Sequence, residues 1–233
     1  MAHIFLVTSG IHGGYGVFEP SVRIEQTLQT AASIRQRVKD CRIMLLEGGA
    51  QPLSQSEYDC LRQQYDQILD YTSDPVIQFA HRAHRDEVIS LKGPCEARML
   101  AQACVVLQPP TEGRVFKISG RYCLSDQFDL DRHLAHAGKY VFLTVQPGER
   151  YDRPHAATPW QYKTRLYSWC RSLWPAATRI YKQQFENIVA SYQQGVFIDI
   201  EHTTYRTISP QIIETIDPIG VQGPAASGTW IQE

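Results

Sequence analysis

The chain has 233 residues, of which 43% are hydrophobic and 20% are charged, and its formal net charge is -1. This length gives room for a sizeable core, and the near-neutral charge argues against nucleic acid as a partner. Six cysteines are scattered without a Cys-x-x-Cys pair, which argues against a zinc knuckle or a disulfide-stapled domain. No apolar run approaches the roughly 20 residues of a membrane span, and the N-terminus does not look like a signal peptide. We therefore expect a cytoplasmic protein with no transmembrane segment.

Strands and helices are predicted to alternate along the first half of the chain. A short, continuously apolar run predicts a buried strand at residues 4–7, and largely apolar runs predict buried strands at residues 42–46 and 115–118, with a further short strand near residues 70–71. Apolar residues at helical spacing predict helices over residues 20–39, 54–69 and 95–107. A strand, a helix and a second strand in this order predict a parallel pair joined by a crossover. The pattern therefore favours an α/β fold.

Longer loops and more aromatic residues mark the second half. Strands are expected at residues 140–145 and 196–200, and helices at residues 129–137 and 176–192. The aromatic residues between 160 and 174, in a partly helical segment, are typical of a core or of a homo-oligomer interface, with stacking on a sugar as the alternative. Residues 220–230 are rich in small side chains and predict a loop or strand that closes over a site.

Three predicted strands end in small or polar residues of one design. These ends are Thr8-Ser9-Gly10, Glu47-Gly48-Gly49 and Ser119-Gly120-Arg121. The carboxyl ends of parallel strands lie at one edge of a sheet, where open α/β folds bind their ligands. An arginine at such an end offers a rigid fork of donors that suits phosphate. The alternative is that the glycines only turn the chain after each strand.

Two segments beside these ends bear on phosphate binding. Lys92, together with the amide groups of the helix start that follows it, offers a second phosphate contact, and the alternative is a capped helix with a solvated lysine. The glycine-rich loop at residues 10–16 matches neither a dinucleotide-binding GxGxxG motif nor a P-loop. His12 within this loop is expected to be an exposed loop residue.

Two further groups of residues are candidates for metal binding or proton transfer. Asp129 and Asp131 match the DxD pattern with which many sugar transferases hold Mg²⁺ or Mn²⁺, although acidic residues at a helix start also interact with the helix dipole. Glu201 and His202 follow a predicted strand, where a carboxylate beside a histidine supplies a general base or metal ligands. The metal ligands stay undecided, with Asp129, Asp131 and His202 as the candidates.

The order of these segments, over nearly the whole chain, resembles the GT-A-like glycosyltransferases, and more closely a divergent bacterial and viral group of them that lacks the standard DxD motif. The matching segments are Arg23-Ile-Glu-Gln-Thr-Leu28, Ile43-Met-Leu-Leu-Glu47, Lys92-Gly-Pro-Cys-Glu-Ala-Arg-Met-Leu100, Phe116-Lys-Ile-Ser-Gly-Arg-Tyr122, Ile200-Glu-His202 and Gly220-Val-Gln-Gly223. The resemblance implies one GT-A-like (Rossmann-like) α/β domain over residues 1–233, with a mainly parallel sheet flanked by helices. Residues 1–125 would bind the nucleotide sugar and residues 126–233 the acceptor.

The resemblance also implies roles for single residues. Those implied at the donor site are Thr8, Ser9, Glu47, Lys92, Glu96, Ser119 and Gly120. Arg121 stands with Ser119 and Gly120 in the place of the metal-binding DxD, so that Arg121 or Lys92 would neutralise the leaving diphosphate. Dependence on Mg²⁺ or Mn²⁺ therefore stays open. Glu201 or His202 would act as general base on the acceptor hydroxyl.

We therefore predict a hexosyl- or deoxyhexosyltransferase that moves a sugar from a nucleotide-diphosphate sugar to a glycan or glycoside hydroxyl, in surface polysaccharide or glycan assembly. A first alternative is a nucleotidyltransferase that makes an activated sugar, although residues 10–16 contain no lysine or arginine to hold a triphosphate. A second is a non-catalytic module that binds a nucleotide or a glycan without turnover.

Overall fold

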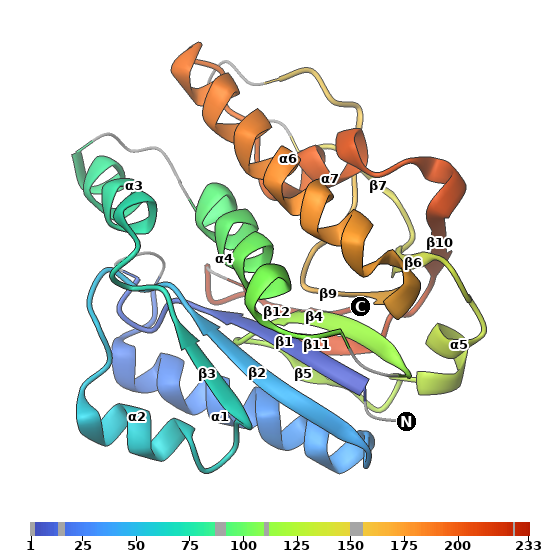
Figure 1. Ribbon diagram of the computed structural model, residues 1–233, viewed down its shortest axis with the longest axis horizontal. Helices are drawn as coiled ribbons and strands as arrows, with labels where there is room; N and C mark the ends of the chain where they lie inside the picture. Colours follow the sequence, from blue (N-terminus) through green and yellow to red (C-terminus); the bar gives the residue numbers. More distant parts are fainter. Residues whose placement is uncertain (1–2, 14–16, 87–91, 110–111, 150–155, 226) are drawn as a thin grey trace.

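A seven-stranded sheet forms the centre of the protein in a computed structural model that describes residues 3–13, 17–86, 92–109, 112–149, 156–225 and 227–233 (Figure 1). Its strands are β1 (His3–Ser9), β2 (Cys41–Glu47), β3 (Gln67–Asp70), β4 (Arg114–Ser119), β6 (Tyr140–Leu143), β9 (Leu166–Cys170) and β10 (Ile213–Ile216). They lie in the order β10-β6-β9-β4-β1-β2-β3. β9 runs antiparallel to its neighbours β4 and β6, and the other pairs are parallel. The predicted α/β fold with a mainly parallel sheet is confirmed.

Helices cover both faces of this sheet. They are α1 (Pro20–Arg37), α2 (Gln55–Leu61), α3 (Pro75–Asp86), α4 (Lys92–Val106), α5 (Leu130–Leu134), α6 (Trp174–Gln193) and α7 (Ile200–Thr207), with 3-10 turns at η1 (Arg171–Leu173) and η2 (Pro210–Ile212). Side chains alternate along β1, so Ile4 and Leu6 pack with α4 and α6, while Phe5 and Val7 pack with α1 (Figure 1). None of the helices in the described residues combines the length and the apolar character that a membrane crossing needs.

A small sheet formed by the C-terminal segment lies next to the end of β4. Its strands are β12 (Trp230–Gln232), β11 (Val221–Pro224) and β5 (Cys123–Leu124), and a separate two-stranded sheet joins β7 (Gln146–Pro147) and β8 (Trp160–Gln161). β5 follows the turn at Arg121, and β11 packs so closely that a Cβ atom added to Gly223 would lie 2.5 Å from the carbonyl oxygen of Arg121. The small-residue segment predicted to close over a site therefore contains the strand that supports this turn.

Three details of the first half differ from the prediction. The capping box of Ser54 and Glu57 starts α2 as expected, but the helix ends at Leu61 because the following residues leave it to pair β3 with β2. α4 begins at Lys92 instead of residue 95, since Pro94 lacks an N–H group and is tolerated in a first helical turn. α3 was not predicted.

The second half of the chain differs from the prediction at three places. Residues 160–174 are helical only at their end, from Arg171 onward, and they also contain two strands that were not predicted, β8 and β9. β9 inserts between β4 and β6 and buries Leu166 to Trp169 completely or nearly so. Residues 196–200 do not form a strand beyond an isolated bridge at Phe197, because Asp199 caps α7 by accepting a hydrogen bond from the amide of His202. The helix predicted over residues 129–137 is reduced to α5.

Candidate functional site

The three predicted strand ends meet at one edge of the sheet. β2, β1 and β4 are adjacent and parallel, with Ser9 opposite Glu47 and Thr8 opposite Ser119. The amide of Gly48 donates to the carbonyl of Ser9 at 3.0 Å, and the amide of Gly120 donates to the carbonyl of Thr8 at 2.8 Å. These bonds carry the strand pairing one residue beyond the strands. The sheet therefore places all three ends side by side.

A cleft opens at this edge, between the strand ends, α1 and the start of α4. It is lined by Thr8, Ser9, Gly10, Arg23, Thr27, Gly48, His81, Lys92, Cys95, Glu96, Met99, Ser119, Gly120 and Arg121. Six of the seven residues that the sequence implied for the donor site are among them, and Arg121 is there as well. Glu47 is the seventh and does not line the cleft.

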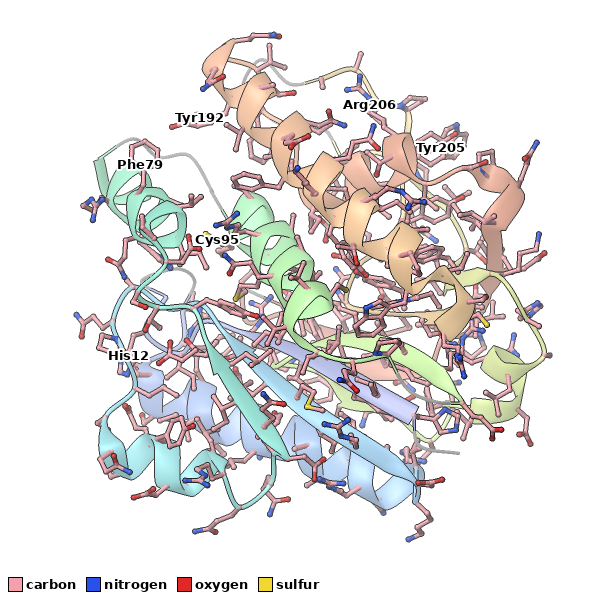
Figure 2. The ribbon with its side chains drawn as sticks, in the orientation of Figure 1. His12, Phe79, Cys95, Tyr192, Tyr205 and Arg206 are labelled. Atoms are coloured by element: carbon pink, nitrogen blue, oxygen red, sulfur yellow. The ribbon has the colours of Figure 1, made fainter. Side chains whose placement is uncertain are left out.

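Helix α4 presents one face and its N-terminal end to the cleft. Lys92, Cys95, Glu96 and Met99 are spaced by three and four residues, which places them on one side of the helix. Cys95 lies in the first turn (Figure 2). Burial raises the pKa of its thiol to about 12, so the thiol stays protonated and is not a nucleophile. The unsatisfied amides of a helix N-terminus attract anions.

Three cationic side chains from three parts of the chain line the cleft. Arg23 comes from α1, Lys92 from α4 and Arg121 from the turn after β4. Burial, followed by repulsion from Arg121 and Arg23, lowers the pKa of Lys92 to about 8. Burial and repulsion from Arg121 also lower the pKa of Arg23. Sequence reasoning missed Arg23 as a site residue, because nothing in the helix distinguishes it from a surface arginine.

Gly120 lies where any larger residue would be crowded. A Cβ atom at this position would lie 3.2 Å from Oγ1 of Thr27 and 3.3 Å from the carbonyl oxygen of Thr8. The Thr27 hydroxyl donates to the carbonyl of Gly120 at 3.2 Å, so α1 and the end of β4 are held together at the cleft. The glycine therefore allows a close approach of backbone to helix, and this reason goes beyond turning the chain.

Lys117 was not predicted and lies at the centre of the hydrogen bonds behind the cleft. Its side chain is fully buried (0% exposed) in β4. The ammonium group pairs with Glu96 Oε1 at 2.6 Å, and donates to Ser119 Oγ at 2.9 Å and to the carbonyl of Thr164 at 2.7 Å. The one signal in the sequence is a lysine inside the apolar run at residues 115–118.

Glu201 and His202 lie in the first turn of α7, so they do not end a strand. The hydroxyl of Thr164 donates to Glu201 Oε1 at 2.9 Å. Burial, then repulsion from Asp199 and Glu96, raises the pKa of Glu201 to about 7. The charge of Glu96 thus affects the pKa of Glu201, although Glu201 is not among the residues that line the cleft. A carboxyl group with a pKa near neutrality is suited to general-base chemistry.

His202 is held firmly inside the protein. Its side chain is 3% exposed, and Nδ1 lies 2.6 Å from Asp199 Oδ1. Burial opposes ionisation, but the hydrogen bond and charge of Asp199 together raise the pKa of His202. A Cβ atom at Gly148 would come within 2.8 Å of Nε2, so the backbone of the loop after β7 packs directly on the ring. The arrangement ties α7 to this loop.

Glu47 points into the protein instead of the cleft. Its side chain is fully buried, and Oε1 accepts hydrogen bonds from the amides of Ile11 and Gly49, both at 2.9 Å. Burial raises the pKa of this carboxyl to about 7 despite these bonds. The carboxyl group joins the loops that follow β1 and β2, and a role of Glu47 at the donor site stays a prediction.

The residues at the cleft do not fit a divalent cation. Ser119, Gly120 and Arg121 offer one hydroxyl and a guanidinium, and the one carboxylate in the described lining, that of Glu96, is paired with Lys117. Asp129 caps α5, accepting from the amides of Asp131 and Arg132, and neither aspartate lines the cleft. No group of three or more metal-ligating side chains occurs in the part of the chain that the structure describes.

His12 lies at the start of α2 (Figure 2), with Nε2 3.2 Å from Glu57 Oε2. The ring is half-buried and paired with this helix, so it differs from the exposed loop residue that the sequence predicted. Residues 14–16 of the same glycine-rich loop lie outside the described residues.

No family model matches the chain, and no curated protein sequence is similar to it. Among solved structures, the chain is similar to the apo form of mouse xyloside xylosyltransferase 1, with 8% sequence identity and a TM-score of 0.47. The likeness covers 93% of this chain and 85% of that chain. At this level it describes a related arrangement of helices and strands and carries no argument about substrate.

Proposed function

We propose that the protein is a glycosyltransferase that binds a nucleotide-diphosphate sugar in the cleft and transfers the sugar to a hydroxyl group of a glycan or glycoside. One observation carries the proposal: Arg23, Lys92 and Arg121 converge at the carboxyl edge of parallel strands, beside the N-terminus of α4. Mutually repelling cations held together are stabilised by a multiply charged anion, and a diphosphate supplies one. All the lining residues lie between positions 8 and 121, in the half predicted to bind the donor.

In the proposed reaction the acceptor oxygen forms a bond to the anomeric carbon of the sugar while the bond from that carbon to the diphosphate oxygen breaks. The proton of the acceptor hydroxyl passes to the carboxylate of Glu201, which the hydroxyl of Thr164 orients. The electron pair of the broken bond stays on the diphosphate, where Arg121, Lys92 and Arg23 stabilise the developing charge. Such a direct displacement inverts the anomeric centre.

The proposal assigns different tasks to the remaining predicted residues. Thr8, Ser9, Ser119 and Gly120 form the floor of the donor site at the strand ends. His202, which is almost fully buried against Asp199 and Gly148, positions the first turn of α7, and the proton acceptor is Glu201. No step is routed through a metal ion, because the residues at the cleft do not fit one. We also propose that the protein acts in the cytoplasm and that the transfer takes place in polysaccharide or glycan assembly.

A thermal-shift series tests the donor site. The protein is titrated with UDP, GDP, CDP, ADP, dTDP and the corresponding nucleoside triphosphates, each with and without Mn²⁺, and the nucleotide sugars of any nucleotide that binds are then tested for turnover. A diphosphate at 100 times its dissociation constant should stabilise the fold by about 2.7 kcal/mol. A lack of stabilisation by every diphosphate contradicts the proposal. Stabilisation only by a nucleoside triphosphate would favour a nucleotidyltransferase, and binding without turnover of any nucleotide sugar would favour a binding module.

A further inference from the structure

A carboxylate lines the cleft that the cations prepare for an anion. Glu96 stands one helical turn after Lys92 on the same side of α4, and its side chain is 19% exposed. A charged carboxylate at this place would repel a diphosphate and would cancel part of the field of Lys92 and Arg121. The Glu96 carboxylate would therefore oppose the binding of a diphosphate, unless another group compensates its charge.

Lys117 is that group. Its ammonium lies 2.6 Å from Glu96 Oε1, behind the cleft and out of contact with solvent. Lys117 does not line the cleft, and its ammonium group interacts with Glu96 and with two oxygen acceptors. A buried ammonium is stable only when it is paired and hydrogen-bonded. The ion pair with Glu96 and the hydrogen bonds to two oxygen acceptors meet this condition.

The same ammonium joins the two sides of the proposed site. One acceptor is the hydroxyl of Ser119, at the strand end that lines the cleft. Another is the backbone carbonyl of Thr164. The side-chain hydroxyl of Thr164 in turn donates to the carboxylate of Glu201. A single side chain in β4 therefore fixes a donor-site hydroxyl, a donor-site carboxylate and the residue that orients the proposed base.

We propose that Lys117 is a positioning residue that neutralises Glu96, so that a diphosphate binds beside a carboxylate which still accepts hydrogen bonds from hydroxyl groups of the ligand. The inference rests on the proposed function and goes beyond it. An acceptor without net charge suits the sugar that is attached to the diphosphate, because sugar hydroxyls are donors and carry no charge. Lys117 itself contacts neither substrate.

A charge cycle tests this role. Wild type, Lys117→Met, Glu96→Gln and the double variant are titrated with inorganic pyrophosphate and with UDP by isothermal calorimetry at pH 7.5. Lys117→Met should bind both probes about tenfold more weakly, because Glu96 is left uncompensated beside the anion. Glu96→Gln should bind at least as tightly as wild type. The double variant should return to within about threefold of wild type, which a merely structural role of Lys117 would not produce.

Each outcome decides the question. Wild-type affinity in Lys117→Met overturns this inference and leaves the proposed function intact. A double variant as weak as Lys117→Met also overturns it, since Lys117 would then act through packing or Ser119. If Lys117→Met does not fold, the other two variants decide, because weak binding by either contradicts charge neutralisation. If wild type binds neither pyrophosphate nor any of the nucleoside diphosphates, the proposed function fails together with the inference.

Discussion

Lys92 and Arg121 line the same cleft from two different elements, and burial together with the repulsion of Arg121 and Arg23 lowers the pKa of Lys92 to about 8. Like charges held this close repel one another, and their repulsion destabilises the fold. The arrangement is typical of a functional site, where binding an anion compensates for the repulsion.

Affinity for a nucleoside diphosphate is therefore expected to depend on pH through Lys92. Below pH 8 the amine is charged and affinity is high; above pH 8 it loses its proton, and affinity falls until the ammonium no longer contributes. Lys92→Arg keeps its charge at every pH in question, so its affinity should stay level between pH 7.5 and 9.5. Calorimetric titrations over this range compare the two proteins. An identical decline in both would show that Lys92 is not the titrating group.

Arg121 is expected to stabilise the leaving diphosphate in place of a metal ion. Arg121→Ala should lower turnover of the nucleotide sugar by about 10² to 10³, the typical loss when one donor to a developing charge is removed. Arg121→Lys should recover only part of the loss, since an ammonium lacks the paired donors of the guanidinium. Wild-type activity should persist in EDTA. Arg179→Ala is the matched control, because Arg179 is an exposed arginine on α6. Full activity of Arg121→Ala would refute the role.

Glu201→Gln is expected to abolish proton transfer and leave donor binding unchanged. Wild-type turnover should rise with pH through about 7, because the base is active only after its raised pKa is passed. The variant should lose about 10² to 10⁴ in turnover and should lose this rising limb. Glu186→Gln, at an exposed glutamate of α6, controls for the charge change. Persistence of the rising limb in Glu201→Gln would assign the base elsewhere.

Local patterns in the sequence were enough to predict the strand ends at the cleft. They were not enough to predict the partners of Lys117 behind the cleft. Each of the ends at Gly10, Gly48 and Gly120 follows a largely apolar run, and parallel pairing alone brings them to one edge. The ion pair of Lys117 joins β4 to α4, and its hydrogen bond to Thr164 spans 47 residues. Periodicity within a segment contains no information about such partners.

The misplacement of Glu201 has a similar cause. The apolar residues before Asp199 are typical of a buried strand, and the capping bond from the amide of His202 to this aspartate decides for a helix instead. β9 was missed because its aromatic residues suit a helix as well as a strand until their neighbours in the sheet are known. In both places tertiary contacts outweigh the local preference.

Glu47 is expected to make stability depend on pH. Its folded pKa of about 7 lies above the ordinary 4.5, so its contribution to stability is complete below pH 4.5 and is lost as the pH rises through 7. Glu47→Gln removes this loss, and its free energy of unfolding relative to wild type should therefore rise by up to about 3 kcal/mol between pH 5 and 8.5. Urea denaturation at the two pH values measures the difference. Glu186→Gln should show no such change, and an equal difference at both pH values for Glu47→Gln would contradict the buried charge.

Gly223 is expected to link the C-terminal sheet to the geometry of the cleft. Its φ of 149° disfavours other residues, and a Cβ atom would lie 2.5 Å from the carbonyl oxygen of Arg121. Gly223→Ala should lower the free energy of unfolding by about 1–3 kcal/mol and should also weaken diphosphate binding, because the turn at Arg121 must move. Gly138→Ala is the control: Gly138 has a φ of 70°, but nothing lies within 4 Å of an added Cβ atom. It should lose stability with no change in affinity. Calorimetry and urea denaturation on both variants separate the two effects, and unchanged affinity in Gly223→Ala would show that β11 does not hold Arg121 in place.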